Sequence, residues 1–203
     1  MGYLVSEALS QQSPEMQAFL LRSSVLEQLN GALCDAVVGS SEAKEQGQAA
    51  LERLERLNLF ITRLDDRGEW FRYHALFQEL LRHELLAREG QAAVFDLHRR
   101  SSEWYAHHGM IDEALAHALK TNDGEVVARL IEHNIERALN EQRWRDLERW
   151  LKLLPDAVIQ QRPALLVALA MVHSIRERLR AIPALLRRAE DLMATHPELS
   201  EAL

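Results

Sequence analysis

His74 has the clearest capacity for chemistry in this sequence, because of where it stands. It ends the aromatic run WFRYH, and an amphipathic helical pattern begins at the next residue. A neutral imidazole both donates and accepts hydrogen bonds, and it gains a positive charge close to physiological pH. An inert residue would turn the chain equally well, so we predict a polar contact at His74. The partner of the His74 side chain could be either a bound ligand or the backbone of the preceding segment.

The other reactive side chains form no recognisable catalytic or metal site. No two of the nine histidines stand four residues apart, HExxH is absent, and Cys34 is the single cysteine. The adjacent His107 and His108 would point in different directions on a helix and would not share an ion easily. The phosphate-binding motifs GxxxxGKS, GxxxxGKT and GxGxxG and the nucleophile motif GxSxG are also absent. We therefore expect no catalytic residues, no metal, no internal disulfide and no enzymatic activity of this chain alone.

The composition is that of a globular protein. The 203 residues are 47% hydrophobic and 27% charged. A membrane helix needs roughly 18 or more uninterrupted apolar residues, and the longest candidate, ALLVALAMV at 164–172, is too short. The first residues show neither a basic region nor an apolar region of a secretory signal. We expect a cytoplasmic protein that does not contact a membrane.

The charge distribution counts against direct contact with nucleic acid. The chain has a formal net charge of −7, and its first 90 residues hold nine Lys and Arg against fourteen Asp and Glu. Affinity for nucleic acid depends largely on neutralising phosphates, so an acidic surface disfavours it. The third expected helix balances Lys44, Arg53 and Arg56 with glutamates, and acidic Asp65 and Asp66 open the expected wing turn.

Local signals predict three helices near the N-terminus. Ser13 followed by Pro14 is typical of a helix start, because serine caps the first turn and proline suits the first helical position. Asn30 is an expected cap of a second, short helix. Ser41 is an expected cap of a third helix, which runs to about residue 57. The inward face of this third helix is expected to carry Leu51, Leu54 and Leu57.

A β-hairpin signal follows at residues 58–74. The segments NLFITRL and EWFRYH are rich in β-branched and aromatic residues, and they flank the turn DDRG, whose Gly68 can adopt a positive φ. Three helices followed by one hairpin is the order of a winged-helix unit, which we place at residues 1–90. The residues expected in the core and at the hinge beside His74 are Phe71, Tyr73, Leu76 and Phe77.

Paired antiparallel helices are expected from residue 91 onward. The pairs begin near residues 91, 123 and 162, a spacing within the range of tetratricopeptide-like repeats. The first pair turns at Gly109, and the third joins PALLVALAMVHSIRERL to IPALLRRAEDLMATH. We expect linking helical pairs at 91–160 and the start of tetratricopeptide-like sensor repeats at 161–203. The fold class is thus mainly α: a winged-helix unit with one β-hairpin, followed by paired antiparallel helices.

Tryptophans and arginines in this helical part have ordinary structural interpretations. Trp104, Trp144 and Trp150 recur among leucines and isoleucines, so we expect them in the core between helices. The most basic stretch is expected to be a solvated helical surface, with a partner surface as the second interpretation. It comprises Arg176, Arg178, Arg180, Arg187 and Arg188.

Several segments, in order, resemble one family. They are YLVSEAL, FLLRSSVLEQLNGALCDAVVG, LERLERLNLFITRLDDRGEWFRYHALFQELLRHEL and LHRRSSEWYAHHGMIDEALAHALK. The family is that of the ATP-dependent LuxR-type transcriptional regulators, maltose-activator-like and of the STAND class. The similarity is dense over residues 3–160 and looser to residue 196.

The resemblance implies a role as the central part of a larger protein. Such proteins have an upstream nucleotide-binding domain with a P-loop, then a winged helix, sensor repeats and a LuxR-type DNA-binding domain. The expected partners are therefore the upstream domain and downstream repeats of the same chain, an inducer, and further copies in self-association. The full-length protein is expected to be a slow signalling ATPase that binds ADP or ATP, with no nucleotide held tightly by this segment.

The resemblance also gives His74 a specific role. In the STAND class, a winged-helix histidine reaches the β-phosphate of ADP on the neighbouring domain and closes the resting form, and His74 occupies the matching RYH position. The alternative is that His74 only tethers the hairpin to the helix. Two other functions remain open for the chain: a free-standing helical-repeat scaffold for protein partners, and a winged-helix DNA binder, which the acidic wing disfavours.

Overall fold

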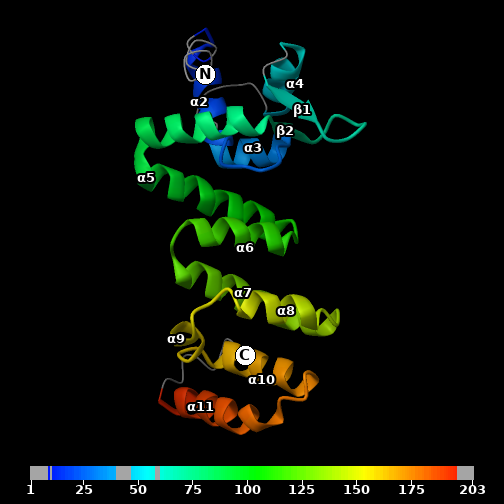
Figure 1. Ribbon diagram of the computed structural model, residues 1–203, viewed down its shortest axis with the longest axis vertical. Helices are drawn as coiled ribbons and strands as arrows, with labels where there is room; N and C mark the ends of the chain where they lie inside the picture. The colour runs from blue at the N-terminus through cyan, green and yellow to red at the C-terminus, as the bar shows by residue number, and fades with distance from the viewer. Residues whose placement is uncertain (1–8, 10, 40–46, 58–59, 196–203) are drawn as a thin grey trace. The chain divides into compact units, whose positions relative to one another are not determined.

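The computed structural model describes residue 9 and residues 11–39, 47–57 and 60–195 of the chain. Helices predominate, and the described residues include one two-stranded antiparallel sheet (Figure 1). The chain forms two compact units, Met1–Thr121 and Asn122–Leu203. The boundary between them lies inside the predicted linking region 91–160. The finer division into three parts stays a prediction.

The first unit begins with the three predicted helices. They are α2 (Pro14–Ser23), α3 (Gly31–Val38) and α4 (Gly47–Arg56). Both described caps form as predicted, because the side chain of Ser13 accepts from the Met16 N–H and that of Asn30 accepts from the Leu33 N–H. The predicted cap Ser41 lies outside the described residues.

The inner face of α4 differs from the prediction at one position. Leu51 and Leu54 are fully buried, whereas Leu57 is 52% exposed. The helix ends at Arg56, so Leu57 follows the last helical turn and is not held on the inner face.

The predicted hairpin forms from β1 (Ile61–Arg63) and β2 (Phe71–Tyr73). The strands pair antiparallel, and the turn closes with Gly68 at a φ of 69°. Strand β2 is the inner strand, because the backbone of Leu29 exchanges two hydrogen bonds of 2.8 Å with Phe71 on its other side. The rings of Phe71 and Tyr73 are buried, which anchors the wing to the helices. The winged-helix prediction is confirmed.

A long helix, α5 (Ala75–His107), continues from the hairpin. The predicted start of a new helix at residue 91 is confirmed, because α5 consists of two helices that meet in a kink at Gly90, whose φ of 79° and ψ of 171° are not helical. Its second half pairs with α6 (Ile111–Lys120), as Figure 1 shows. The turn between them contains Gly109 at a φ of 72°, as predicted.

The second unit contains the other predicted helical pairs. Its elements are α7 (Gly124–Asn140), α8 (Trp144–Leu151), α9 (Asp156–Ile159), α10 (Pro163–Ile175), η1 (Leu179–Ala181) and α11 (Ile182–Thr195). Helix α7 packs with α8, and α10 packs with α11. The sequence PALLVALAMVHSIRERL was expected to be helical throughout. Helix α10 ends earlier because Glu177 adopts a φ of 57°, and a short 3-10 turn replaces the last helical turn.

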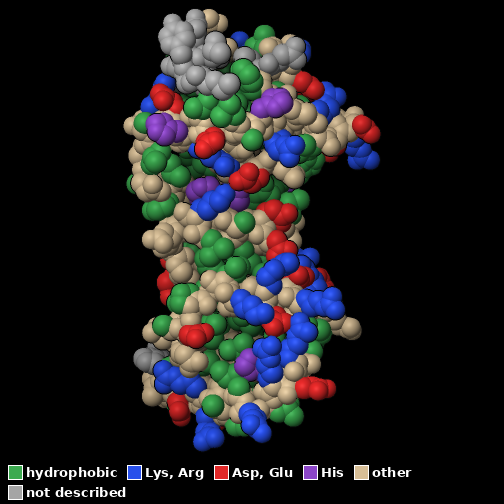
Figure 2. Space-filling model, viewed as in Figure 1, with side chains coloured by type: hydrophobic (Ala, Val, Ile, Leu, Met, Phe, Trp, Pro, Cys, Tyr) green, Lys and Arg blue, Asp and Glu red, His purple; other side chains and the backbone are tan. Residues whose placement is uncertain are grey.

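The tryptophan prediction holds fully for Trp150, which is buried, while Trp104 and Trp144 are half-buried. The ring of Trp104 stacks on that of His108 with centroids 3.8 Å apart. The predicted basic stretch is solvated, since all five of its arginines are exposed. Figure 2 shows Lys and Arg side chains gathered over the face of the second unit that is turned to the viewer.

Candidate functional site

His74 stands between strand β2 and helix α5. Its backbone N–H donates to the Phe60 carbonyl over 2.8 Å, and its own carbonyl accepts from the Gln78 N–H as the first turn of α5 closes. Its side chain is exposed and does not cap the helix. The Nε2 atom lies 3.5 Å from the Thr62 hydroxyl, at the long limit for a hydrogen bond. The backbone therefore ties the hairpin to the helix, while the imidazole faces outward.

Exposed apolar side chains flank this imidazole. Phe60 is 43% exposed and stacks on buried Phe77 with ring centroids 4.9 Å apart. Leu76, expected to pack in the core or hinge, is 53% exposed instead. Its place in the first turn of α5 turns its side chain to the outside, whereas Phe77 at the next position points inward. We call Leu57, Phe60 and Leu76, together with His74, the His74 surface.

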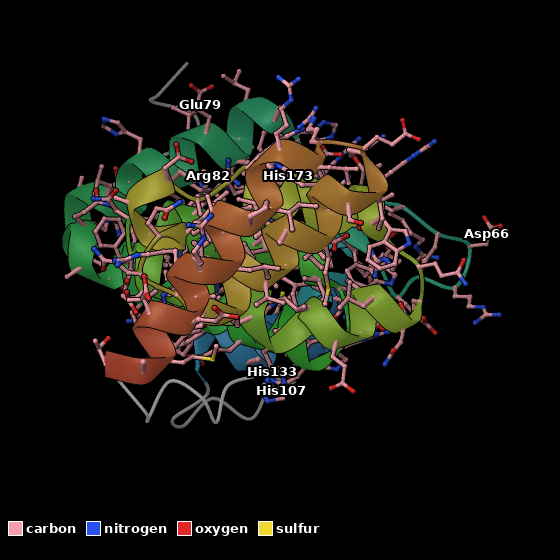
Figure 3. All side chains as sticks on the ribbon, turned by 90° about the horizontal axis from the view of Figure 1, so that it is seen from below. Asp66, Glu79, Arg82, His107, His133 and His173 are labelled. Carbon is pink, nitrogen blue, oxygen red and sulfur yellow. The ribbon has the colours of Figure 1, made fainter. Side chains whose placement is uncertain are left out.

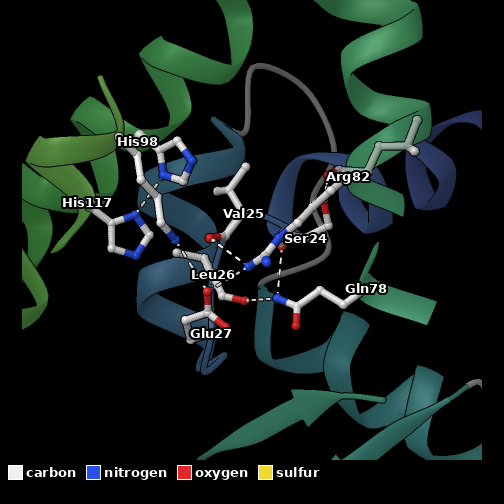
Figure 4. Close-up of polar contacts among 10 residues, drawn as sticks. Ser24, Val25, Leu26, Glu27, Gln78, Arg82, His98 and His117 are labelled. Carbon is white, nitrogen blue, oxygen red and sulfur yellow. Dashed lines mark hydrogen bonds and ion pairs between the residues drawn. The ribbon is translucent and has the colours of Figure 1, made fainter. Parts of the chain in front are cut away.

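Helix α5 also holds the connection between α2 and α3. The amide nitrogen of Gln78 donates to the carbonyls of Ser24 and Leu26, over 3.0 and 2.5 Å. One turn further on, Arg82 Nε donates to the Ser24 carbonyl over 2.7 Å (Figure 4). These bonds satisfy backbone groups that would otherwise lie buried and unpaired. They also fix the first half of α5 rigidly on the winged helix.

Glu27 on this connection joins both helices of the hairpin α5–α6. Its carboxylate lies 2.9 Å from Arg82 Nη2 and 3.3 Å from Lys120 Nζ. Partial burial raises the pKa of Glu27, but Arg82 and Lys120 outweigh it and hold that pKa below its ordinary value. The carboxylate is therefore charged at neutral pH and bridges the winged helix to α6.

Two buried histidines meet between α5 and α6. The Nδ1 atoms of His98 and His117 lie 2.9 Å apart (Figure 4). Burial lowers the pKa of His98 to about 4 and the pKa of His117 to about 3. The nearby Lys120 lowers both pKa values further, and His98 itself lowers the pKa of His117.

This pair was not predicted from the sequence. One signal could have indicated it: the two residues lie on opposite sides of the expected turn at Gly109, within about three helical turns of it, on the inner faces of two antiparallel helices. Residues so placed in a helical hairpin tend to face each other. Neither residue lies in a motif, and their separation of 19 residues fits no metal-ligand spacing.

A groove of about 580 Å³ lies beside this pair, between the wing and α6. Leu64 and Trp70 line it from the hairpin, and Tyr105 and Glu113 line it from the helices α5 and α6. His117 forms part of its wall. The groove belongs entirely to the first unit.

The described residues contain neither a metal-binding cluster nor a membrane-spanning helix. Within residues 9, 11–39, 47–57 and 60–195, there is no cluster of three or more His, Cys, Asp or Glu side chains that could hold a metal ion. No helix in the same ranges is long and apolar enough to cross a membrane. Asp66 stands at the outer end of the hairpin loop (Figure 3), where phosphates would meet a carboxylate. The localisation and the lack of activity stay predictions.

Comparison with known proteins finds one family model and several curated relatives that are similar to this chain. Residues 5–94 match the model of the MalT winged helix domain. The chain is 34% identical over 192 residues to the HTH-type transcriptional regulator MalT of Klebsiella pneumoniae (strain 342). The proteins of the same name from Cronobacter sakazakii and Yersinia enterocolitica are 35% and 36% identical over 191 residues.

These alignments cover 94–95% of this chain but 21% of each relative. The chain thus spans about a fifth of the length of the curated relatives that it matches. The resemblance inferred from the sequence is confirmed to this extent: the chain is a MalT-like segment whose residues 5–94 match the MalT winged helix domain.

Proposed function

We propose that this chain is a regulatory segment of an ATP-dependent transcriptional activator. In this proposal, the winged helix responds to the nucleotide bound by an upstream domain, and the helical pairs lead to repeats that sense an inducer. The similarity to regulators named HTH-type and the match to their winged helix domain support the regulatory role. ADP or ATP would be bound by the full-length protein, whose open form would self-associate.

The outward imidazole of His74 is the single observation that carries the nucleotide part of the proposal. It stands at the N-terminus of α5, where backbone N–H groups and the helix dipole favour a negative charge. A neutral imidazole can donate a hydrogen bond to a phosphate oxygen, and an imidazolium adds a positive charge. Such a charge-assisted bond is worth about 1.5–3 kcal/mol, enough to bias a two-state closure.

The exposed leucines and Phe60 support a domain contact at the same place. Leu57, Phe60 and Leu76 are 52%, 43% and 53% exposed. Phe60 is hydrogen-bonded to His74 through the backbone and Leu76 lies two residues beyond it, and exposed apolar side chains beside a polar group are typical of an interaction surface. An upstream domain packed on the His74 surface would cover these side chains and bring its nucleotide within reach of the imidazole.

The contacts of α5 provide a route from His74 toward the repeats. The helix begins directly after His74, is fixed by Gln78 and Arg82, and pairs with α6 beyond the kink. A change in the position of the winged helix would therefore move α5 and α6 with it. This arrangement supports a latch that couples nucleotide state to sensing.

The test uses the full-length protein with His74→Ala and His74→Gln. We expect both variants to release ADP faster and to raise transcription without inducer. The change should be smaller in His74→Gln, because the amide of Gln can still donate a hydrogen bond to the phosphate. The matched control is His83→Ala, an exposed histidine further along α5. Unchanged ADP release and basal transcription in the His74 variants would refute the latch and favour the alternative of a protein-binding scaffold.

A further inference from the structure

The groove between the wing and α6 offers an accessible hydroxyl group. Tyr105 is 4% exposed and lines the groove, and its hydroxyl has no hydrogen-bond partner within the described part of the chain. This hydroxyl is not among the fully enclosed polar atoms without a partner, which in the described residues comprise Nδ1 of His173, so it remains accessible to solvent. Tyr73 differs, since its hydroxyl lies 2.9 Å from the Ser23 hydroxyl in the core. The hydroxyl of Tyr105 is therefore available to a ligand in the groove.

The electrostatics of the groove favour a positively charged ligand. Glu27, Asp65 and Glu113 line it, and Lys120, the Lys or Arg side chain that the described residues contribute to its wall, is already paired with Glu27. Burial keeps His117 neutral by lowering its pKa to about 3. The whole first unit has twelve Lys and Arg against eighteen Asp and Glu. This field repels phosphates and carboxylates and attracts cations.

The aromatic and apolar side chains that line the groove favour a guanidinium over other cations. The rings of Trp70 and Tyr105 provide aromatic surface, on which a planar guanidinium stacks more favourably than an ammonium. A guanidinium also presents several donors at once, which suits the carboxylate of Glu113 and the hydroxyl oxygen of Tyr105. The groove, at about 580 Å³, is much larger than one such group. Leu64 and Met110 in its wall would contact apolar side chains beside the cation.

We propose that this groove binds an arginine side chain, together with its apolar neighbours, from a peptide segment of a protein partner. The guanidinium pairs with Glu113, donates to the Tyr105 hydroxyl and stacks against Trp70. Neighbouring apolar side chains of the partner pack on Leu64 and Met110. This site is separate from the His74 surface and does not depend on nucleotide.

The first test titrates the 203-residue chain with the peptide acetyl-Leu-Arg-Leu-amide. The readout is the indole N–H signal of Trp70 in a proton–nitrogen correlation spectrum, assigned with Trp70→Phe. We expect a saturable shift with this peptide and none with its twin that carries neutral citrulline in place of arginine. Equal shifts with both peptides, or no shift at millimolar peptide, would overturn the proposal.

Variants then locate the site. Glu113→Gln is expected to weaken binding about tenfold and Tyr105→Phe several-fold, because each removes one polar partner of the guanidinium. The matched control is Asp112→Asn, which changes the other acidic residue in the first turn of α6 and lies outside the groove. An equal loss of peptide affinity in Asp112→Asn would refute the assignment of the site to this groove. Agmatine binding as tightly as the peptide would also refute it, by assigning the groove to a small cation.

Discussion

The side chains of His98 and His117 meet nitrogen to nitrogen, with their Nδ1 atoms 2.9 Å apart in the buried contact between α5 and α6. One ring must donate its Nδ1 proton and the other must accept it, so the two neutral rings are in different tautomers. Protonation of the accepting nitrogen would place two N–H groups against each other. Arg82 and Lys120 also oppose a charge here, and Glu27 alone among the neighbouring charged groups favours one.

This pair predicts that the first unit loses stability in acid. The pKa of each ring lies below the ordinary value of 6.5, so the unfolded chain binds more protons than the folded chain as the pH falls. The stabilisation is complete above about pH 6.5 and is lost toward the folded-state pKa values of about 4 and about 3. We expect urea unfolding to show a loss on the order of 2 kcal/mol between neutral pH and about pH 5, allowing for partial solvent screening.

A double replacement isolates the contribution of the pair. His98→Leu with His117→Leu removes both polar groups together, so no unpaired nitrogen remains and the acid sensitivity should decrease. His133→Gln, at an exposed site, should leave the pH profile unchanged. A wild-type profile that is flat between neutral pH and about pH 5 would show that the rings are not held neutral.

Two tyrosines of similar burial should respond differently to loss of the hydroxyl. Tyr73→Phe breaks the 2.9 Å contact with Ser23 in the core and should cost about 1 kcal/mol of unfolding free energy. Tyr105→Phe removes a hydroxyl without a partner in the described residues and should cost less than about 0.5 kcal/mol. Denaturant unfolding of both variants measures the difference, and equal losses would contradict it.

Local signals in the sequence predicted most of the winged helix. The capping residues Ser13 and Asn30 and the turn residue Gly68 act on residues close to them in the sequence. Their structural roles can therefore be predicted from the local sequence. The helix break at Gly90 was predicted as the start of a new helix at residue 91. The end of α10 near Glu177 was missed because it depends on a single backbone conformation inside an otherwise helical pattern.

Side-chain partners between distant segments could not be predicted in this way. Glu27 meets Lys120 across 93 residues, and no periodicity links them. The exposure of Leu76 likewise depends on how α5 packs as a whole. For His74, the resemblance supplied a role, but only the structure shows that its imidazole points outward.

Gly90 should tolerate no side chain, although there is space for one. No atom lies within 4 Å of a Cβ added there, but its φ of 79° is unfavourable for any other residue. Gly90→Ala should therefore destabilise the first unit by about 1–2 kcal/mol. Gly124→Ala is the matched control, because Gly124 is equally open and begins α7 with an ordinary φ; it should be neutral or stabilise by about 0.5 kcal/mol. Thermal unfolding of both variants distinguishes strain from crowding, and a neutral Gly90→Ala would show that the kink can straighten.

The bridge from Glu27 to its two basic partners should be unequal in strength. Lys120 makes only an exposed ion pair at 3.3 Å, whereas Arg82 also donates to the Ser24 carbonyl over 2.7 Å. A double-mutant cycle with Glu27→Gln and Lys120→Met should give a coupling of about 0.5 kcal/mol or less, which disappears in high salt. Arg82→Leu should cost about 1–2 kcal/mol even in high salt, because it leaves a part-buried carbonyl with one donor fewer. A Glu27–Lys120 coupling that persists in high salt would instead show that α6 is held on the winged helix by a desolvated ion pair.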